Sequence, residues 1–132
     1  MNLLHNNTLG IDIGSTTVKI AVLDSEHHML FTDYERHYAN IQETLALLLS
    51  KAKEKLGEMT VSPSITGSGG LSLSGHLNLT FTQEVVAVAT ALQDYAPQTD
   101  VAIELGGEDA KIIYFTGGID QRMNGICAGG TG

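Results

Sequence analysis

Residues 9–24, Leu-Gly-Ile-Asp-Ile-Gly-Ser-Thr-Thr-Val-Lys-Ile-Ala-Val-Leu-Asp, carry the pattern that decides the fold. Two runs rich in β-branched residues flank a turn of small residues, which predicts a β-hairpin with strands over about 8–14 and 17–24. The stretch does not fit a Walker-type phosphate loop, because that loop needs a GxxxxGK[ST] sequence followed by a helix.

The turn of this hairpin, Gly14-Ser15-Thr16-Thr17, is suited to holding phosphate. Glycine leaves backbone N–H groups uncovered, and three hydroxyl groups stand beside them. Asp12 would repel a bare phosphate, but its carboxylate is a ligand that a phosphate-bound magnesium ion prefers. We therefore predict a nucleotide-phosphate hairpin, with an ordinary glycine turn as the alternative.

Composition indicates one folded globular domain. With 132 residues, 42% of them hydrophobic, 17% charged and only two of them proline, the chain is long enough for a core and too apolar for a disordered segment. Fifteen acidic residues against seven basic ones give a net charge of −8, which disfavours nucleic acid and anionic membranes as partners.

The cytoplasm is the expected compartment. Residues 1–7 lack the basic region and apolar run of a signal peptide, and no stretch reaches membrane-spanning length. The single cysteine, Cys127, excludes an internal disulfide and suits a reducing compartment. We expect structural or surface roles for the five histidines, which show no metal-ligand spacing: His5, His27, His28, His37 and His76.

Beyond the hairpin, the pattern predicts a third antiparallel strand and then helices alternating with strands. A helix is expected over 41–56, because apolar residues recur there at i, i+3, i+4 and i+7, with Asn40 as N-cap and Gly57 as the stop. The other expected elements are strands over 28–35, 62–67, 100–105, 110–115 and 119–124 and helices over 71–77 and 84–95.

We expect these strands to form one mixed sheet with helices on its faces. Ligands of such sheets gather at the carboxyl ends of strands, where Gly14, Gly67 and Gly106 are all expected. Three glycine turns would then converge on one cleft.

A second acid-glycine turn, in residues 104–111 (Glu-Leu-Gly-Gly-Glu-Asp-Ala-Lys), repeats the order of the opening hairpin. Its acids, Glu108 and Asp109, are suited to holding a metal-bound water. Capping of a tight turn is the alternative role for both.

Three motifs together resemble a known family: residues 12–17, residues 104–111, and residues 123–132 (Met-Asn-Gly-Ile-Cys-Ala-Gly-Gly-Thr-Gly). From Leu9 to Gly132 the chain resembles the N-terminal half of the ATP-dependent activators of 2-hydroxyacyl-CoA dehydratases, close relatives of the ATPase subunits of benzoyl-CoA reductase. The first motif also occurs in sugar kinases, actin and Hsp70-type chaperones, whereas the cysteine motif is far narrower. With glutamate at both 104 and 108, the Glu-Leu-Gly-Gly-Glu-Asp pattern resembles the long, multidomain activases more than the short activators.

The resemblance implies an α/β, ribonuclease-H-like fold of the actin type, with a mixed sheet, a three-strand antiparallel meander and helices on its faces. Residues 1–132 would form a single N-terminal lobe of a two-lobe ATPase, as a fragment of a longer activase. The resemblance also implies a homodimer that holds a four-iron (4Fe-4S) iron–sulfur cluster at its interface. ATP hydrolysis would drive an electron from a donor such as ferredoxin or flavodoxin to the dehydratase component.

Residue roles follow from the same resemblance. Asp12 would lie near magnesium, and Glu108 and Asp109 would act near the metal or the attacking water. Cys127 would be a cluster ligand, with the second cluster cysteine outside this chain. The residues that would contact the ATP phosphates are Gly14, Ser15, Thr16, Thr17, Lys19, Gly106 and Gly107.

Two other functions are possible for a protein of this fold. A small-molecule kinase of the same fold would have no use for Cys127, and a nucleotide-dependent scaffold would tolerate its loss. The alternative role of Cys127 is that of a small buried hydrophobe, and the alternative role of Lys19 is that of a solvated strand lysine. We expect the 132 residues by themselves to bind ATP weakly or not at all, because half of a two-lobe cleft leaves the adenosine unburied.

Overall fold

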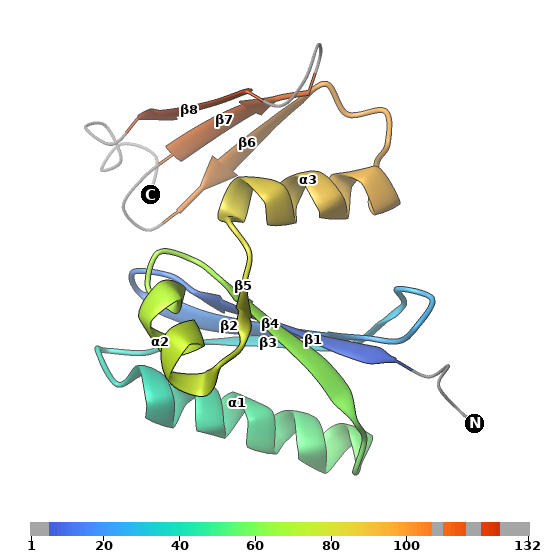
Figure 1. Ribbon diagram of the computed structural model, residues 1–132, viewed down its shortest axis with the longest axis vertical. Helices are drawn as coiled ribbons and strands as arrows, with labels where there is room; N and C mark the ends of the chain where they lie inside the picture. The colour runs from blue at the N-terminus through green and yellow to red at the C-terminus, as the bar shows by residue number, and fades with distance from the viewer. Residues whose placement is uncertain (1–5, 107–109, 116–119, 125–132) are drawn as a thin grey trace. The chain divides into compact units, whose positions relative to one another are not determined.

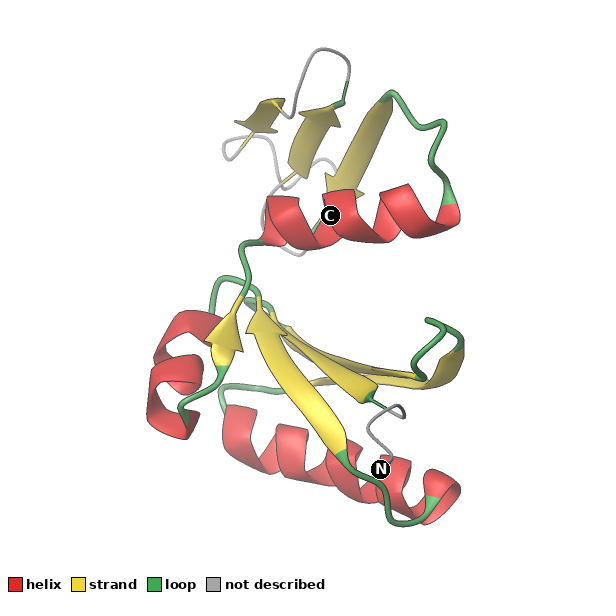
Figure 2. Cartoon of the chain, turned by 45° about the vertical axis from the view of Figure 1, so that its right-hand side comes forward, coloured by secondary structure: helices red, strands yellow, loops and turns green. Residues whose placement is uncertain are grey.

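The computed structural model describes residues 6–106, 110–115 and 120–124. Within it the chain forms two compact units, Met1–Thr82 and Gln83–Gly132 (Figures 1 and 2).

The first unit is built on a five-stranded mixed sheet in the order β3-β2-β1-β4-β5. β1, β2 and β3 form an antiparallel meander, whereas β4 runs parallel to β1 and β5 parallel to β4. α1 runs beneath the sheet in both views (Figures 1 and 2), and α2 packs against β4 and β5. The elements are β1 (Asn7–Ile13), β2 (Thr17–Leu23), β3 (Met29–Arg36), α1 (Ile41–Leu56), β4 (Val61–Thr66), α2 (Gly70–Leu77) and β5 (Thr80–Phe81).

Alternation along the strands gives this sheet two different faces. In β1, Leu9, Ile11 and Ile13 are buried, whereas Gly10 and Asp12 between them lie on the opposite face. The helices cover the apolar face, and each fully buried aliphatic side chain stabilises the unit by about 1.5–3 kcal/mol. The core residues are Leu9, Ile11, Ile13, Val18, Ile20, Val22, Leu45, Leu48, Ala52 and Ile65.

α1 spans the predicted residues, but its first turn differs in detail from the expectation. Asn40 occupies the N-cap without a side-chain capping bond; instead its carbonyl accepts hydrogen bonds from the N–H and the hydroxyl of Thr44. Gly57 ends the helix at φ +78°, and its N–H donates to the Lys53 carbonyl over 2.8 Å.

The tight turn between β2 and β3 is organised by one carboxylate. Asp24 Oδ1 accepts hydrogen bonds from the N–H groups of His28, at 2.9 Å, and of Glu26, at 2.8 Å. The bond from His28 is the main reason why the pKa of Asp24 is lowered from its ordinary value of 3.8. The turn is therefore held by a carboxylate whose ionised form these backbone N–H groups favour.

The second unit contains α3 (Glu84–Tyr95) and an antiparallel sheet of β6 (Val101–Leu105), β7 (Ala110–Tyr114) and β8 (Asp120–Asn124). The predicted elements are present, but β6 does not extend the first sheet, which corrects the expectation of one sheet. β6 pairs with β7, which follows it closely in sequence, and joining strands across a short loop costs little chain entropy.

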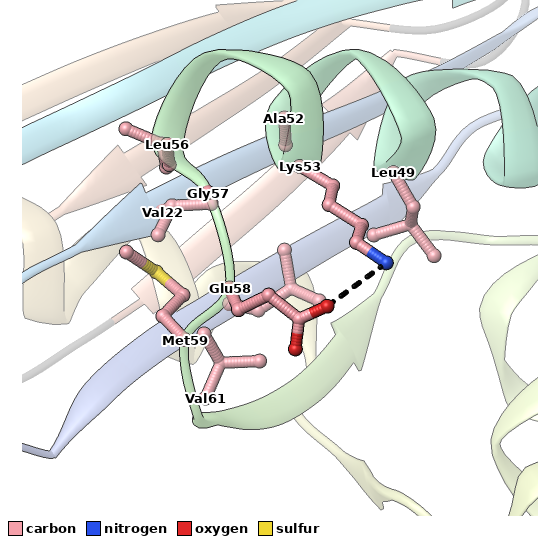
Figure 3. Close-up of a pocket in the computed structure, with 10 residues that line it drawn as sticks. Val22, Leu49, Ala52, Lys53, Leu56, Gly57, Glu58, Met59 and Val61 are labelled. Atoms are coloured by element: carbon pink, nitrogen blue, oxygen red, sulfur yellow. Dashed lines mark ion pairs between the residues drawn. The ribbon is translucent and has the colours of Figure 1, made fainter.

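A cavity of about 270 Å³ opens in the first unit between the end of α1, the start of β4 and the end of β2 (Figure 3). Its lining is mainly apolar, and its two charged residues, Lys53 and Glu58, pair with each other, with Nζ 3.3 Å from Oε1. The cavity lies at the end of the sheet opposite Gly14, so it is separate from the phosphate turn.

No helix in the described residues is long and apolar enough to cross a membrane.

Candidate functional site

The β1–β2 turn forms the predicted phosphate hairpin in outline. Gly14 donates its N–H to the carbonyl of Thr17 over 2.9 Å, which closes the turn. The N–H groups of Ser15 and Thr16 donate no hydrogen bond to any residue that the structure describes. Ser15 is an exposed residue, so the turn beside Gly14 is open to solvent.

Three polar side chains form a row across β2, β1 and β4, on the sheet face away from α1. Strand register places Asp12 opposite both Lys19 of β2 and Thr66 of β4. Lys19 Nζ lies 3.9 Å from Asp12 Oδ2, and the two side chains are 57% and 39% exposed. Both groups are therefore open to a ligand from solvent.

Thr66 is the member of this row that sequence analysis missed. Its hydroxyl oxygen is buried and has no hydrogen-bond partner among the described residues. Buried polar atoms are nearly always paired, so a water or a ligand oxygen is the expected partner. No sequence signal marked Thr66, because its role depends on the register between β4 and β1.

The second glycine turn packs tightly against the end of β1. Gly69 donates its N–H to the Ile13 carbonyl over 2.9 Å. Gly67 adopts φ +99°, and a Cβ there would clash with the backbone carbonyl of Ile13 and would lie 2.5 Å from Asp12 Oδ1. The turns after β1 and β4 therefore lie together, as predicted, and only glycine fits against the Asp12 carboxylate.

The third glycine turn begins at Gly106, at the end of β6. Glu104 of β6 and Lys111 of β7 are cross-strand partners, the same arrangement as Asp12 and Lys19 in the first unit. Lys111 is buried and forms an ion pair with Glu84 at the start of α3. This pair ties the helix to the sheet within the second unit.

Several predicted site residues lie outside the described residues: Gly107, Glu108, Asp109 and Cys127. Their roles stay predictions, as does the meeting of Gly106 with Gly14 at one cleft. Within the described ranges, no group of three or more His, Cys, Asp and Glu side chains is placed to hold a metal ion.

The mixed sheet and its glycine turns are typical of actin-type ATPase lobes. A family match identifies the family to which the chain belongs. The chain matches the BadF/BadG/BcrA/BcrD ATPase family over residues 9–132, so it belongs to that family.

Among its relatives, the (R)-2-hydroxyglutaryl-CoA dehydratase activating ATPase of Acidaminococcus fermentans is 28% identical over 130 residues, which cover 95% of this chain and 49% of that protein. A protein of Methanocaldococcus jannaschii is 27% identical and is covered over 51% of its length. The chain therefore spans about half the length of the curated relatives it matches.

Solved structures agree with this assignment. Component A of the (R)-2-hydroxyglutaryl-CoA dehydratase of Acidaminococcus fermentans is similar with a TM-score of 0.74 and 26% identity, over 93% of this chain and 49% of that one. The activator of the 2-hydroxyisocaproyl-CoA dehydratase from Clostridium difficile, solved with ADPNP, shares the fold with a TM-score of 0.75 and 24% identity, over 92% of this chain and 47% of that one. The family and the actin-type α/β fold expected from the sequence are confirmed.

Proposed function

We propose that this chain is the phosphate-binding part of an ATP-dependent activator, which hydrolyses ATP to deliver an electron to a 2-hydroxyacyl-CoA dehydratase or a related CoA-ester reductase. One observation carries the proposal: the turn of residues 14–17 has unused N–H donors beside Asp12, in a chain that the ATPase family matches over residues 9–132. The similarity to dehydratase activators supports the choice of partner.

In this proposal the hairpin turn binds the ATP phosphates. Ser15 and Thr16 offer N–H groups and hydroxyls, Thr17 adds a third hydroxyl, and Gly14 leaves room for an oxygen to approach. Lys19 supplies positive charge on the same face of the sheet. Because the chain has a net charge of −8, these local donors rather than a general basic surface hold the nucleotide.

Asp12 would hold magnesium indirectly, through a water molecule bound to the ion. Magnesium keeps several waters and uses one or two carboxylates together with substrate phosphates, so a single exposed carboxylate beside phosphate donors fits the ion. Magnesium would neutralise phosphate charge. The orphaned Thr66 hydroxyl next to Asp12 is placed to bind a water of this site.

The motif of residues 106–109 would act on the terminal phosphate. We assign phosphate contacts to Gly106 and Gly107, and the orientation of magnesium or of the attacking water to Glu108 and Asp109. This assignment rests on the sequence of the turn.

Electron transfer is assigned to Cys127, which we propose as a ligand of a four-iron cluster shared by two copies of the full-length protein. Two copies contribute two such thiolates, and a cluster of this type takes four, so a second cysteine outside these residues completes the set. A ferredoxin or flavodoxin is the proposed electron donor, and the cytoplasm the proposed compartment.

Magnesium-dependent ATP hydrolysis by the full-length protein tests the proposal through Asp12→Asn, which removes the charge and keeps the shape. We expect turnover to fall by about 100-fold or more, a typical loss for one group that stabilises reacting charge, with an unchanged melting temperature. Glu54→Gln, an exposed acid of α1, is the charge-matched control. Unchanged turnover in Asp12→Asn would remove Asp12 from the site.

A small-molecule kinase remains the alternative, since the hairpin motif is shared with kinases of this fold. Iron analysis and the visible spectrum of anaerobically purified full-length protein separate the two. A brown, iron-containing protein supports the activator, and a colourless protein with Cys127 intact supports the kinase.

A further inference from the structure

His37, in the connection between β3 and α1, contacts the phosphate turn directly. Its side chain is buried, with only 8% of the residue exposed. The backbone N–H of His37 donates to the Thr16 carbonyl over 3.0 Å, and ring Nε2 lies 3.1 Å from the Gly14 carbonyl oxygen. One residue therefore binds two carbonyls of the turn.

The hydrogen bonds of the ring define its tautomer. Ala39 donates its N–H to Nδ1 over 3.0 Å, so Nδ1 is an acceptor and carries no hydrogen. In the neutral ring the hydrogen is then on Nε2, which donates it to the Gly14 carbonyl. Each ring nitrogen has one partner, and the ring orientation is fixed.

The loop around His37 is shaped to hold this geometry. Tyr38 and Ala39 adopt φ values of +45° and +67°, the left-handed region that residues other than glycine rarely enter. The turn is closed by Asn40, whose N–H donates to the His37 carbonyl over 2.7 Å. Such conformations persist where surrounding contacts over-determine them, and they cluster at functional sites.

We propose that His37 is a positioning residue of the phosphate turn, an inference that rests on the nucleotide function proposed above. In a trans peptide the C=O and the next N–H point in opposite directions. Because the Gly14 carbonyl points to the His37 ring, the N–H of Ser15 points away from it, toward the exposed side of the turn. His37 thus presets a donor for phosphate before the nucleotide arrives.

Two substitutions separate the two ring bonds. In the variant His37→Gln, the side-chain NH2 group can reach the position of Nε2, which keeps the hydrogen bond to the Gly14 carbonyl but removes the acceptor for Ala39. His37→Asn places its side-chain oxygen near Nδ1, which keeps the acceptor for Ala39 but removes the donor to Gly14. His76→Gln, at an exposed histidine of α2, is the control.

The dissociation constant of a fluorescent ATP analogue with magnesium, measured on the full-length protein, is the readout, together with melting temperature. We expect His37→Asn to weaken binding about 10-fold, the value of one hydrogen bond of about 1.4 kcal/mol, and His37→Gln to stay within about threefold. Melting temperatures of the two variants should be similar, since each loses one bond.

The outcomes separate this inference from the proposed function. Wild-type affinity in both variants overturns the positioning role and leaves the nucleotide function standing. If both variants lose nucleotide affinity equally, and in proportion to a fall in melting temperature, His37 is a purely structural residue. That result also overturns the positioning role. A wild-type protein that binds no magnesium nucleotide overturns the proposed function, and this inference with it.

Discussion

At the scale of single residues, the carboxyl ends of β1 and β4 depend on groups that leave space and groups that hold the backbone in place. Gly67 leaves room for the Asp12 carboxylate, and His37 holds the Gly14 carbonyl. Gly67 acts on the position of Asp12, and His37 acts on the peptide that carries the Ser15 N–H. A change of one methyl group or one ring nitrogen is therefore expected to alter the proposed phosphate site.

Gly67→Ala tests the close approach of the second glycine turn to β1. The added Cβ would lie 2.5 Å from Asp12 Oδ1 at a backbone φ of +99°, so we expect the free energy of unfolding to fall by about 2–4 kcal/mol, measured by urea denaturation. Gly57→Ala has a similar positive φ but no atom within 4 Å of the new Cβ. Because Gly57 lies at ψ −164°, a region that is essentially confined to glycine, we expect a loss of about 1–3 kcal/mol from backbone strain without any steric clash. Equal losses in the two variants would show that backbone strain alone matters at Gly67.

At the scale of elements, α1 stabilises the sheet through one stripe of its surface. Leu48 is fully buried in the core, whereas its neighbour Leu47 is 48% exposed. Another contact is polar: Lys51 Nζ lies 2.9 Å from Glu35 and 3.2 Å from Asp33 of β3, and these bonds raise the pKa of Lys51. That network is partly exposed to water, which weakens its ion pairs, so we expect packing to dominate.

Leu48→Ala should lower the free energy of unfolding of the first unit by about 2–5 kcal/mol, because it removes buried methyl groups and leaves a cavity. Hydrogen exchange of β1 and β2 amides, read by mass spectrometry, reports the loss locally. Leu47→Ala, one position away in the same helix, should change protection by less than about 1 kcal/mol. A comparable effect at both positions would contradict the packing of α1 described above.

At the scale of the whole molecule, each of the two units contains a cross-strand pair of an acid and a lysine. An acid at the end of the first strand faces a lysine of the second, as Asp12 and Lys19 in one unit and Glu104 and Lys111 in the other. The proposed function adds a third part, the cysteine motif, which the 132 residues carry only once.

Cys127→Ser in the full-length protein tests that third part. We expect iron and visible absorption to be lost, because serine does not replace a thiolate ligand of such a cluster, while the affinity for magnesium nucleotide stays within about threefold of wild type, less than the change expected from one lost hydrogen bond. Iron content retained in the variant would exclude Cys127 as a ligand. Nucleotide affinity that falls with the iron would contradict the separation of the two sites.

Periodicity predicted most of the elements. The 3.6-residue pattern placed α1 over 41–56 and the alternating pattern placed the opening meander, because local burial dictates both. The two-residue strand β5 was missed, since two residues carry no period. The separation of β6 from the first sheet was also missed, because a strand pattern identifies a strand without naming its sheet.

The sequence by itself determined the family, the opening hairpin and the Asp12–Thr17 motif, since these follow from residue order and from local chain geometry. Tertiary structure alone decided that Thr66 stands beside Asp12 and that His37 holds the turn, because both depend on groups far apart in sequence. It also decided burial: Ile11 is 3% exposed and Ile103, in the matching position of the second meander, is 66% exposed. Whether an apolar strand face is buried depends on the element that packs against it, and similar strand sequences do not specify that element.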